Sequence, residues 1–344
     1  MADKKIIIKS LYKIFGKNPG VALEHVKQGV EKDELLEKHN HVLGLSNIDL
    51  DIFSHSIQVI MGLSGSGKST LIRHINRLIE PTVGKIIVED QEITNLNTDQ
   101  LRDFRRKKTA MVFQRFALLP HKTVLQNVSF GLDIQKRDPI ESKSKAMKWI
   151  ERVGLNGYET KYPQHLSGGM QQRVGLARAL SNDADILLMD EAFSALDPLI
   201  RKNMQDILLE LQSELKKTVI FITHDLDEAL KLGDRIAILK DGKMDQEGEP
   251  IDILLNPKTS YVKEFVEDVN RGRVLKAKNI METSEKIDLK SVNGNSLKIQ
   301  ENLPIEMFIN KVIKEKPEMI EVINTANDTV GYISAERLST ILEK

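Results

Sequence analysis

The sequence predicts an α/β fold with a mixed, mainly parallel sheet, and two observations support this class. Short apolar runs alternate along the chain with longer helical segments, which is the pattern of parallel strands whose faces are covered by helices. Polar residues directly follow several of these runs, at the carboxyl ends of strands where such sheets bind ligands. The 344 residues exceed what one core usually serves, so two domains are expected.

The amino-acid composition argues against several classes of function and site. Lys and Arg number 50 and Asp and Glu also number 50, so the chain has no overall field to attract nucleic acid. The basic run Arg102–Lys108 could form a nucleic-acid patch, but such runs are more often a solvated face. The absence of cysteine excludes disulfides and thiolate metal sites and fits a reducing cytoplasm. The sequence shows no signal-peptide core and no membrane-spanning run, so any membrane role is expected to come through a partner.

The N-terminal part of the chain is expected to form strands with one interruption. Lys5–Leu11 alternates well enough for an edge strand, and residues 12–16 follow as a turn. Residues 17–43 contain a charged helical segment, Val21–Lys38, and we interpret them as a surface insertion. Strand character resumes at Leu45–Ile52.

The strongest local signal is a phosphate-binding loop. It matches the pattern G-x-x-x-x-G-K-[ST] and lies between an expected buried strand, Ile57–Met61, and an expected helix, Ser69–Leu78. Backbone N–H groups of such a loop surround triphosphate oxygens at a helix N-terminus, whose dipole favours anions. Lys68 is expected to reach the β and γ phosphates, and Ser69 to bind Mg²⁺. The predicted loop residues are Gly62, Ser64, Gly65, Ser66, Gly67, Lys68, Ser69 and Thr70.

The alternation of strands and helices continues beyond the loop. Predicted strands are Lys85–Glu89, Thr109–Phe113, Ile186–Met189, Thr218–Ile222 and Arg235–Leu239. Predicted helices are Thr98–Arg106, Leu199–Leu215 and Leu226–Leu232, with interrupted helical character from Ile140 to Leu180. Gln114 follows one strand, and the apolar loop Phe116–His121 after it suggests a docking surface.

Two adjacent carboxylates, Asp190 and Glu191, directly follow a predicted buried strand. Asp190 is expected to hold Mg²⁺, and Glu191 to orient or deprotonate an attacking water. The cation would keep one acid ionised while the second can titrate, so neighbouring acids suit these two roles.

The motifs over residues 57–224 resemble those of ATP-binding cassette (ABC) ATPases, and they stand in the family's order. Leu166–Gln171 is similar to the signature motif, and Ser194–Asp197 to the D-loop. Gln114 matches the Q-loop glutamine, and His224 the switch histidine. The resemblance implies a P-loop NTPase fold of the ABC type, with ATP and Mg²⁺ as its ligands.

The resemblance also implies how such a site works. Cassettes hold each ATP between two subunits, so the chain is expected to act as a homodimer in which positioning and charge stabilisation drive phosphoryl transfer. His224 would contact the γ phosphate and align Glu191, and Phe15 would stack on adenine. The implied catalytic residues are Lys68, Gln114, Glu191 and His224; the implied magnesium ligands are Ser69, Gln114 and Asp190; the residues implied to reach the nucleotide or dimer seam from the partner are Ser167, Gly168, Gly169, Gln171 and Asp197.

The expected domain arrangement favours a transporter. A nucleotide-binding domain is expected at residues 1–270, with a helical subdomain at about 115–180. The segment from Lys68 to Ser167, about 100 residues, has the size of such a subdomain and is far too short for the long coiled coil of chromosome or repair ATPases. Strings such as Val59–Lys68 and Met189–Arg201 closely resemble the ATPase subunit of glycine betaine/proline importers. That likeness implies uptake of quaternary-ammonium osmoprotectants, with integral-membrane permease subunits and a substrate-binding protein as partners. It places the chain at the cytoplasmic face of the plasma membrane as a peripheral subunit, without a nucleic-acid partner.

The sequence is also compatible with other functions. The solute could be choline, carnitine or taurine, and a soluble cassette ATPase acting on nucleic acid or ribosomes is a further alternative. A nucleotide-gated scaffold without catalysis would need a damaged site, which the intact Lys68 and Glu191 argue against. Two departures from the family pattern stand out: Ser54-His55-Ser56 replaces a glycine-containing turn, and Arg115 follows Gln114 where a small residue is usual.

Residues 271–344 are expected to form a second, small α+β unit. Glu318–Ser334 predicts two strands around a polar turn, and Ala335–Leu342 a helix, which is similar to the end of a cystathionine-β-synthase (CBS) regulatory repeat. The segment holds one repeat, which could pair with its copy in an ATPase dimer. Ligand-binding repeats carry an Asp three residues after a Ser or Thr, whereas Arg337 follows Ser334 here, so adenosine binding is not expected. The unit could sense ionic strength or only stabilise a dimer.

Overall fold

The computed structural model describes residues 3–114, 116–194, 196–282 and 296–343, so Arg115 lies outside the described residues. The chain forms two compact units, Met1–Glu249 and Pro250–Lys344, which are considered separately. The predicted domain boundary, between residues 270 and 271, lies inside the second of these units. None of the helices in the described ranges combines the length and apolar character that crossing a bilayer requires.

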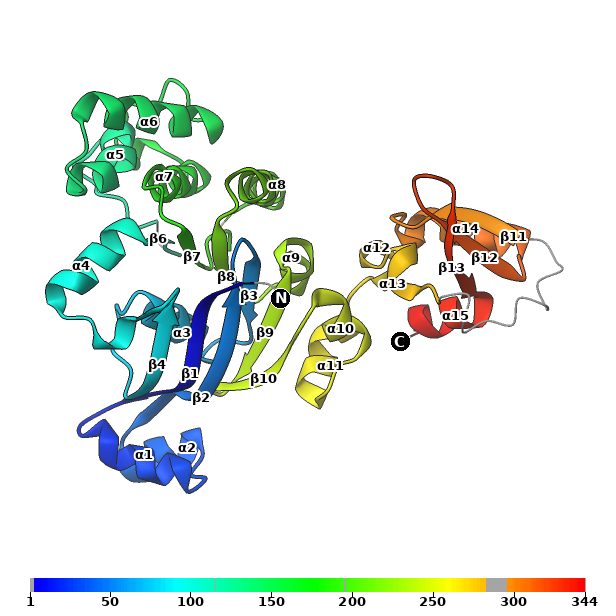
Figure 1. The fold of residues 1–344 in the computed structure, drawn as a ribbon, viewed down its shortest axis with the longest axis horizontal. Coiled ribbons are helices and arrows are strands. Elements are labelled where there is room, and N and C mark those ends of the chain that lie inside the picture. The colour runs from blue at the N-terminus through cyan, green and yellow to red at the C-terminus, as the bar shows by residue number, and fades with distance from the viewer. Residues whose placement is uncertain (1–2, 115, 195, 283–295, 344) are drawn as a thin grey trace. The chain divides into compact units, whose positions relative to one another are not determined.

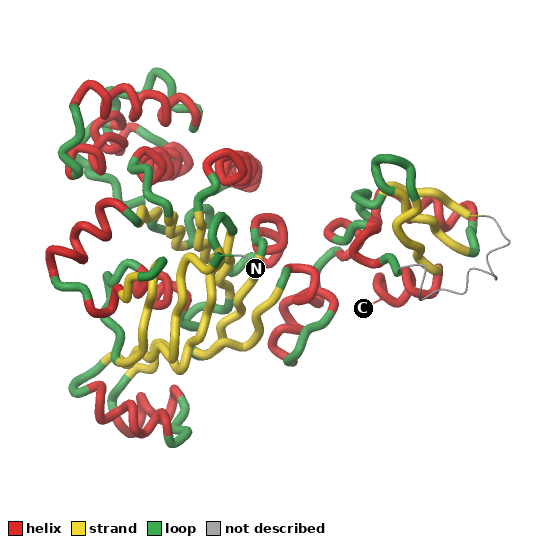
Figure 2. The backbone as a smooth tube through the Cα atoms, viewed as in Figure 1, coloured by secondary structure: helices red, strands yellow, loops and turns green. Residues whose placement is uncertain are grey.

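The larger sheet of the first unit is mainly parallel, as the sequence predicts. In the described residues its strand order is β10-β9-β3-β8-β7-β6, with β10 antiparallel at one edge. Figure 2 draws the strands of the chain in yellow. Every residue of β3, β7 and β8 is buried, which explains their continuous apolar runs. The strands are β3 (Ile57–Met61), β6 (Thr109–Val112), β7 (Ile186–Asp190), β8 (Thr218–Ile222), β9 (Arg235–Lys240) and β10 (Lys243–Gly248).

The smaller sheet is antiparallel, and it corrects the expectation of an edge strand at Lys5–Leu11. In this sheet β1 pairs with β2 on one side and β4 on the other, and it continues to Phe15, where a turn was expected. Residues alternate in burial because only one face of β1 meets the core, so alternation does not distinguish edge from interior strands. The strands are β1 (Lys4–Phe15), β2 (Val42–Phe53), β4 (Val83–Val88) and β5 (Gln91–Glu92).

The helix α3 (Lys68–Ile75) positions the phosphate-binding loop. Its apolar residues Leu71, Ile72 and Ile75 are fully buried in one core with side chains from both sheets. Because this helix begins at Lys68, its packing fixes where the preceding loop sits. Further elements of this unit are the short 3₁₀ turn Ile93–Asn95 and the helices α4 (Thr98–Lys107), α8 (Pro198–Leu215) and α9 (Leu226–Leu232).

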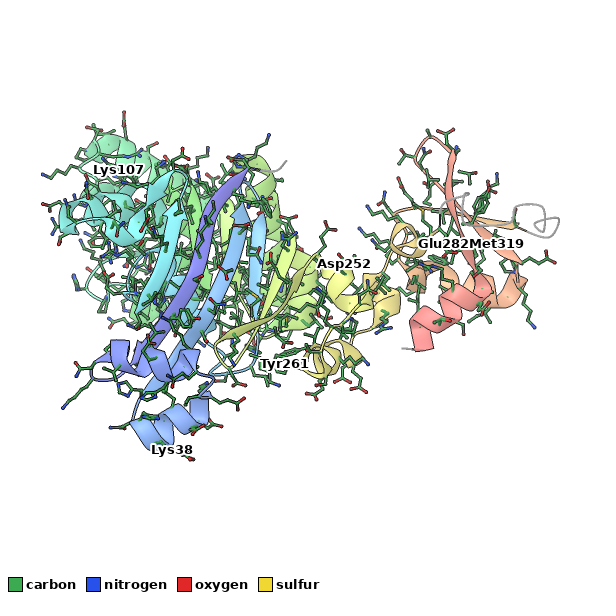
Figure 3. All side chains as sticks on the ribbon, turned by 60° about the horizontal axis from the view of Figure 1, so that its bottom comes forward. Lys38, Lys107, Asp252, Tyr261, Glu282 and Met319 are labelled. Atoms are coloured by element: carbon green, nitrogen blue, oxygen red, sulfur yellow. The ribbon has the colours of Figure 1, made fainter. Side chains whose placement is uncertain are left out.

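The basic run Arg102–Lys108 forms the end of α4 and the residue after it. Arg102 pairs with Asp99 at 2.8 Å, and Arg106 with Asp103 at 3.6 Å, on the same helix. Lys107, labelled in Figure 3, is also exposed, so much of the run is a solvated helix face.

Three helices, α5, α6 and α7, gather beside the end of the larger sheet at β6 and β7 (Figure 1). A capping box of Thr123 and Gln126 caps the N-terminus of α5, and the side chain of Asp138 caps the N-terminus of α6. The Ser167 hydroxyl accepts a hydrogen bond from the Met170 N–H and so caps α7. The bounds are α5 (Val124–Ile134), α6 (Pro139–Arg152), the 3₁₀ turn Pro163–His165 and α7 (Gly168–Ser181).

The insertion contains two helices where one was expected. These are α1 (Pro19–Lys27) and α2 (Lys32–His39), and Gly29 separates them with a φ of +98°, a conformation that glycine adopts without strain. Ala22, Leu23, Val26 and Leu35 are buried in a small core of their own with Ile14 and Leu43 of the antiparallel sheet. The insertion is therefore a packed lobe at one end of that sheet.

The turn Ser54-His55-Ser56 adopts the conformation that a glycine would favour. His55 has a φ of +62°. Its backbone N–H donates to the Thr218 hydroxyl at 3.0 Å, and its ring Nδ1 contacts the Lys216 carbonyl. These contacts hold a non-glycine residue in the left-handed region at a cost of about 1–2 kcal/mol.

The second unit contains a small sheet with helices. In the described residues β11 pairs with β12 in parallel, and β12 pairs with β13 in the antiparallel arrangement expected around the polar turn. Met319, which begins β12, and Glu282, which pairs with Arg337, are labelled in Figure 3. The elements are α10 (Pro250–Leu255), α11 (Ser260–Glu267), α12 (Arg271–Val274), α13 (Ala277–Ile280), β11 (Ser296–Gln300), α14 (Ile305–Glu315), β12 (Met319–Ile323), β13 (Thr329–Ser334) and α15 (Ala335–Glu343).

Candidate nucleotide-binding site

A cavity of about 420 Å³ lies over the phosphate-binding loop. It extends from the aromatic ring of Phe15 at the end of β1 to Gln114 and Glu191 at the carboxyl ends of β6 and β7. Most predicted loop residues therefore line one space with two predicted catalytic residues. The lining residues are Phe15, Lys32, Val42, Leu43, Gly44, Ser64, Gly65, Gly67, Lys68, Ser69, Thr70, Gln114 and Glu191.

Lys68 is the buried cation of this cavity. Its ammonium donates to the carbonyl oxygens of Gly62 and Leu63 at 2.8 and 3.0 Å, and lies 3.9 Å from a carboxylate oxygen of Glu191. Burial lowers the pKa of Lys68, an effect partly offset by the charges of Glu191 and Asp190. The two shortest contacts of the ammonium are to neutral carbonyls, so an anion that enters the cavity would displace mainly uncharged partners.

Gly62 occupies a place that no other residue fits. Its φ is +144°, and an added Cβ would lie 2.2 Å from the Leu239 carbonyl oxygen. We expect Gly62→Ala to lower the free energy of unfolding by about 2–4 kcal/mol, measured by urea denaturation. The matched control is Gly20→Ala in α1, where a Cβ meets no atom within 4 Å and alanine is expected to be neutral or stabilising. Equal stability of the two variants would contradict this account of the loop.

The magnesium-binding prediction rests on a hydroxyl and a carboxylate that the fold brings together. The Ser69 hydroxyl donates to Asp190 Oδ1 at 2.7 Å, and the Arg73 guanidinium lies 3.0 Å from Asp190 Oδ2. Asp190 is only 2% exposed. In the described residues, no group of three or more His, Cys, Asp or Glu side chains could hold a metal by itself. One carboxylate and one hydroxyl are nevertheless what Mg²⁺ uses when phosphate oxygens complete its shell.

Glu191 lies at the centre of the predicted catalytic residues. The Gln114 amide donates to its Oε2 at 2.7 Å, while the Lys68 ammonium and the His224 ring nitrogen Nδ1 lie 3.9 and 4.0 Å from its Oε1. Its φ of +46° is unusual for a residue other than glycine, and such strain gathers at functional sites. The structure thus brings the other three predicted catalytic residues together around the carboxylate of Glu191.

Phe15, the last residue of β1, lines the same cavity as Glu191. The residue is 38% exposed, and the ammonium of Lys13 lies 4.9 Å from the centroid of its ring. The ring also packs closely on Gly44, where an added Cβ would meet it at 2.8 Å. A base could therefore stack on the exposed part of an aromatic ring that its neighbours already hold in place.

The remaining predicted residues are not part of this cavity. Ser167 and Gly168 are exposed at the start of α7, and Asp197 is exposed before α8. The Gln171 amide instead donates to the carbonyls of Pro163 and Leu166, at 3.1 and 3.2 Å. Ala195, in the D-loop-like segment, lies outside the described residues.

Two arginines connect the segments that carry the motifs. Arg178 of α7 donates to the carbonyls of Phe116 and Ala117, at 3.1 and 2.7 Å, in the loop after Gln114. Arg201 of α8 donates to carbonyl oxygens of the segment before α8 and lies 3.3 Å from the carboxylate of Asp225, the residue after His224. A change at one motif can therefore displace another through a direct contact.

Sequence reasoning missed several of these residues. Arg73 is four residues after Ser69, on the same helix face, so helical spacing could have identified it. Arg178 and Lys32 donate to carbonyls of segments far away in the sequence, and Arg201 contacts Asp225, 24 residues further along the chain. No local pattern indicates these contacts.

Comparisons with known proteins show which family the chain is similar to. Residues 45–194 match the family model described as ABC transporter. A glycine betaine transport ATP-binding protein of Bacillus subtilis is 53% identical over 98% of this chain and 80% of its own length. The chain is also similar to a trimethylamine N-oxide transport system ATP-binding protein of Pelagibacter ubique, at 45% identity over 98% of this chain and 97% of the relative. A dimeric ATP-binding cassette solved in a post-hydrolysis state with ADP and Pi superposes with a TM-score of 0.61, at 33% identity, covering 71% of this chain and 98% of that one.

Proposed function

Because the chain belongs to the ATP-binding cassette family of transporter ATPases, we propose that it hydrolyses ATP to drive import of glycine betaine or a related osmoprotectant. The similarity to a glycine betaine transport ATP-binding protein over 98% of the chain is the observation that supports the solute class most strongly. The catalytic residues around Glu191 support hydrolysis over a scaffold role.

The residues of the cavity support separate roles in ATP binding and hydrolysis. Phe15 stacks on adenine, and the backbone N–H groups and Lys68 of the loop bind the phosphates. Ser69, Asp190 and Gln114 would hold Mg²⁺, which neutralises charge that develops on the transferred phosphoryl group. Glu191 accepts a proton from the attacking water, while Gln114 and His224 keep its carboxylate in place.

The exposed signature segment supports a homodimer in which each site is shared. Ser167, Gly168 and Gly169 carry small side chains or none, and Ser167 and Gly168 are exposed beside a helix N-terminus. Such an end suits a γ phosphate bound by the loop of a partner subunit. Asp197, also exposed, would lie at the seam between the subunits.

The apolar loop after Gln114 supports docking to a permease. It includes Phe116 and Ala117, both at positive φ, and Arg178 holds their carbonyls. We place the chain as a peripheral subunit at the cytoplasmic face of the membrane, with permease subunits and a substrate-binding protein completing the importer.

The direct test is ATP hydrolysis by the chain reconstituted in lipid with its permease and binding protein. Glycine betaine, proline, choline, carnitine, taurine and trimethylamine N-oxide would be added in turn. Stimulation by glycine betaine or proline supports the proposal. Stimulation by trimethylamine N-oxide alone would favour the second candidate, which rests on the 45% identity to the Pelagibacter ubique relative.

The second unit supports a regulatory role that depends on ionic strength. Arg337 pairs with Glu282 at 3.1 Å, and its backbone N–H donates to the Ser334 hydroxyl, so the two side chains at the expected ribose position already have internal partners. Lys298 pairs with Glu321 at 3.4 Å between neighbouring strands. Partly exposed ion pairs of this kind weaken as salt rises.

We expect deletion of residues 275–344 to abolish the salt dependence of transport. The reason is that the salt-sensitive pairs of the second unit are lost with it, while the nucleotide site lies in the first unit. Solute uptake into vesicles across a series of KCl concentrations measures this, with ATP hydrolysis as the control for folding. Unchanged salt dependence would leave the unit with a dimer-stabilising role only.

A further inference from the structure

The insertion predicted at residues 17–43 carries α1 and α2 between β1 and β2, is firmly packed and lies close to the phosphate-binding loop. Leu35 of α2 is fully buried against residues of α1, β1 and β2. The rings of His25 and His39 stack with centroids 4.0 Å apart and join α1 to α2. The ring of His41 contacts the carbonyl oxygens of Lys17 and His39. Side chains on α2 are thus carried by a helix in a defined position.

Lys32, the first residue of α2, extends from this lobe into the nucleotide cavity. Its ammonium donates to the carbonyl oxygen of Gly65 at 2.8 Å, and its side chain lines the cavity together with Lys68 and Ser64. An insertion distant in sequence from the motifs therefore adds a second ammonium to the space where phosphates bind.

The charge of Lys32 has no anionic partner in the described part of the chain. Its recorded contact is the neutral Gly65 carbonyl, and the acidic Glu34 of the same helix pairs with Lys38 at 2.8 Å instead. A half-buried ammonium bound only to a carbonyl is suited to an anion that enters the cavity, because charge-assisted hydrogen bonds are the stronger kind.

We propose that Lys32 is a nucleotide-binding residue, and that its ammonium contacts the polyphosphate of ATP. The insertion thereby becomes part of the ATP site, and nucleotide binding is coupled to the position of α2. The proposal rests on the proposed function in that the cavity must hold ATP, but it concerns a residue outside every family motif.

The test uses the full-length chain and three variants. Lys32→Met removes the charge and keeps the length of the side chain, and Lys32→Arg restores the charge. The matched control is Lys38→Met at the other end of α2, labelled in Figure 3, where the side chain is 67% exposed. Titration calorimetry with MgATP at low and high KCl measures the dissociation constant, and thermal unfolding checks that each variant is folded.

We expect Lys32→Met to raise the dissociation constant for MgATP about tenfold at low salt, with Lys32→Arg recovering most of the loss and Lys38→Met unchanged. The difference between Lys32→Met and wild type should shrink at high salt, because the lost contact is ionic. Equal affinity of Lys32→Met and Lys38→Met would overturn the proposal. Equal losses in Lys32→Met and Lys32→Arg would also overturn it, since shape and not charge would then matter. If wild-type protein bound no MgATP, the nucleotide site itself would be refuted and the role of Lys32 with it.

Discussion

Glu191→Gln is expected to lower ATP hydrolysis by about 10²–10⁴-fold while ATP binding stays close to wild type. The glutamine amide has nearly the size of the carboxylate but cannot accept a proton from water. The groups that bind the phosphates, Lys68 and the loop N–H groups, are unchanged. Steady-state phosphate release measures the loss, and nucleotide titration measures the retained affinity.

The same variant should accumulate as an ATP-bound dimer, since the shared site forms but cannot hydrolyse its ATP. Size-exclusion chromatography with MgATP detects this species. Glu210→Gln on the exposed face of α8 is a suitable control, because it also removes one carboxylate but lies outside the cavity. Hydrolysis at the wild-type rate in Glu191→Gln would exclude Glu191 as the proton acceptor.

The mainly parallel sheet could be predicted from the sequence because its signals are local. The strands β3 and β8 and the helix α9 have the predicted bounds, since fully buried strands form continuous apolar runs and a helix of this kind begins at a capping Asp225. The interior position of β1 could not be predicted. It depends on a third strand, β4, that joins from about 75 residues further along the chain, and strand pairing over such a distance leaves no local pattern.

The same distinction applies to the candidate site. Residues in short sequence motifs could be predicted, whereas residues placed by long-range packing could not. The loop from Gly62 to Thr70 and the Asp190–Glu191 pair are short motifs. The structure places most of the loop and Glu191 around one cavity with Gln114, and Asp190 is buried next to Ser69. Lys32 reaches this space only because Leu35 packs α2 onto the antiparallel sheet, a long-range consequence of folding. The break between α1 and α2 at Gly29 could not be predicted either, because the charged residues on both sides of it favour a continuous helix.

The sharing of each site between two subunits can be tested by mixing two variants that are each inactive. Lys68→Ala removes the buried cation that binds the phosphates. Gly168→Asp places a negative charge where the partner's γ phosphate would lie. It should not harm the fold, because an added Cβ would meet the nearest atom, Phe116 Cζ, at an ordinary 3.7 Å, and an acidic residue is favourable in the first turn of a helix.

Each variant alone is expected to lose hydrolysis by about 10²-fold or more, because charge stabilisation of the phosphoryl group fails in both of its sites. In a mixed dimer the two defects fall on the same site, and the other site combines an intact loop with an intact signature segment. Random mixing makes half of the dimers mixed, so activity should return to about a quarter of wild type. Native mass spectrometry confirms that mixed dimers form. If they form and remain as inactive as either variant alone, a site that is shared between subunits and works independently is ruled out. If both single variants keep full activity, the proposal that two subunits share each ATP site is refuted. The exposed residues at the start of α7 would then need another role.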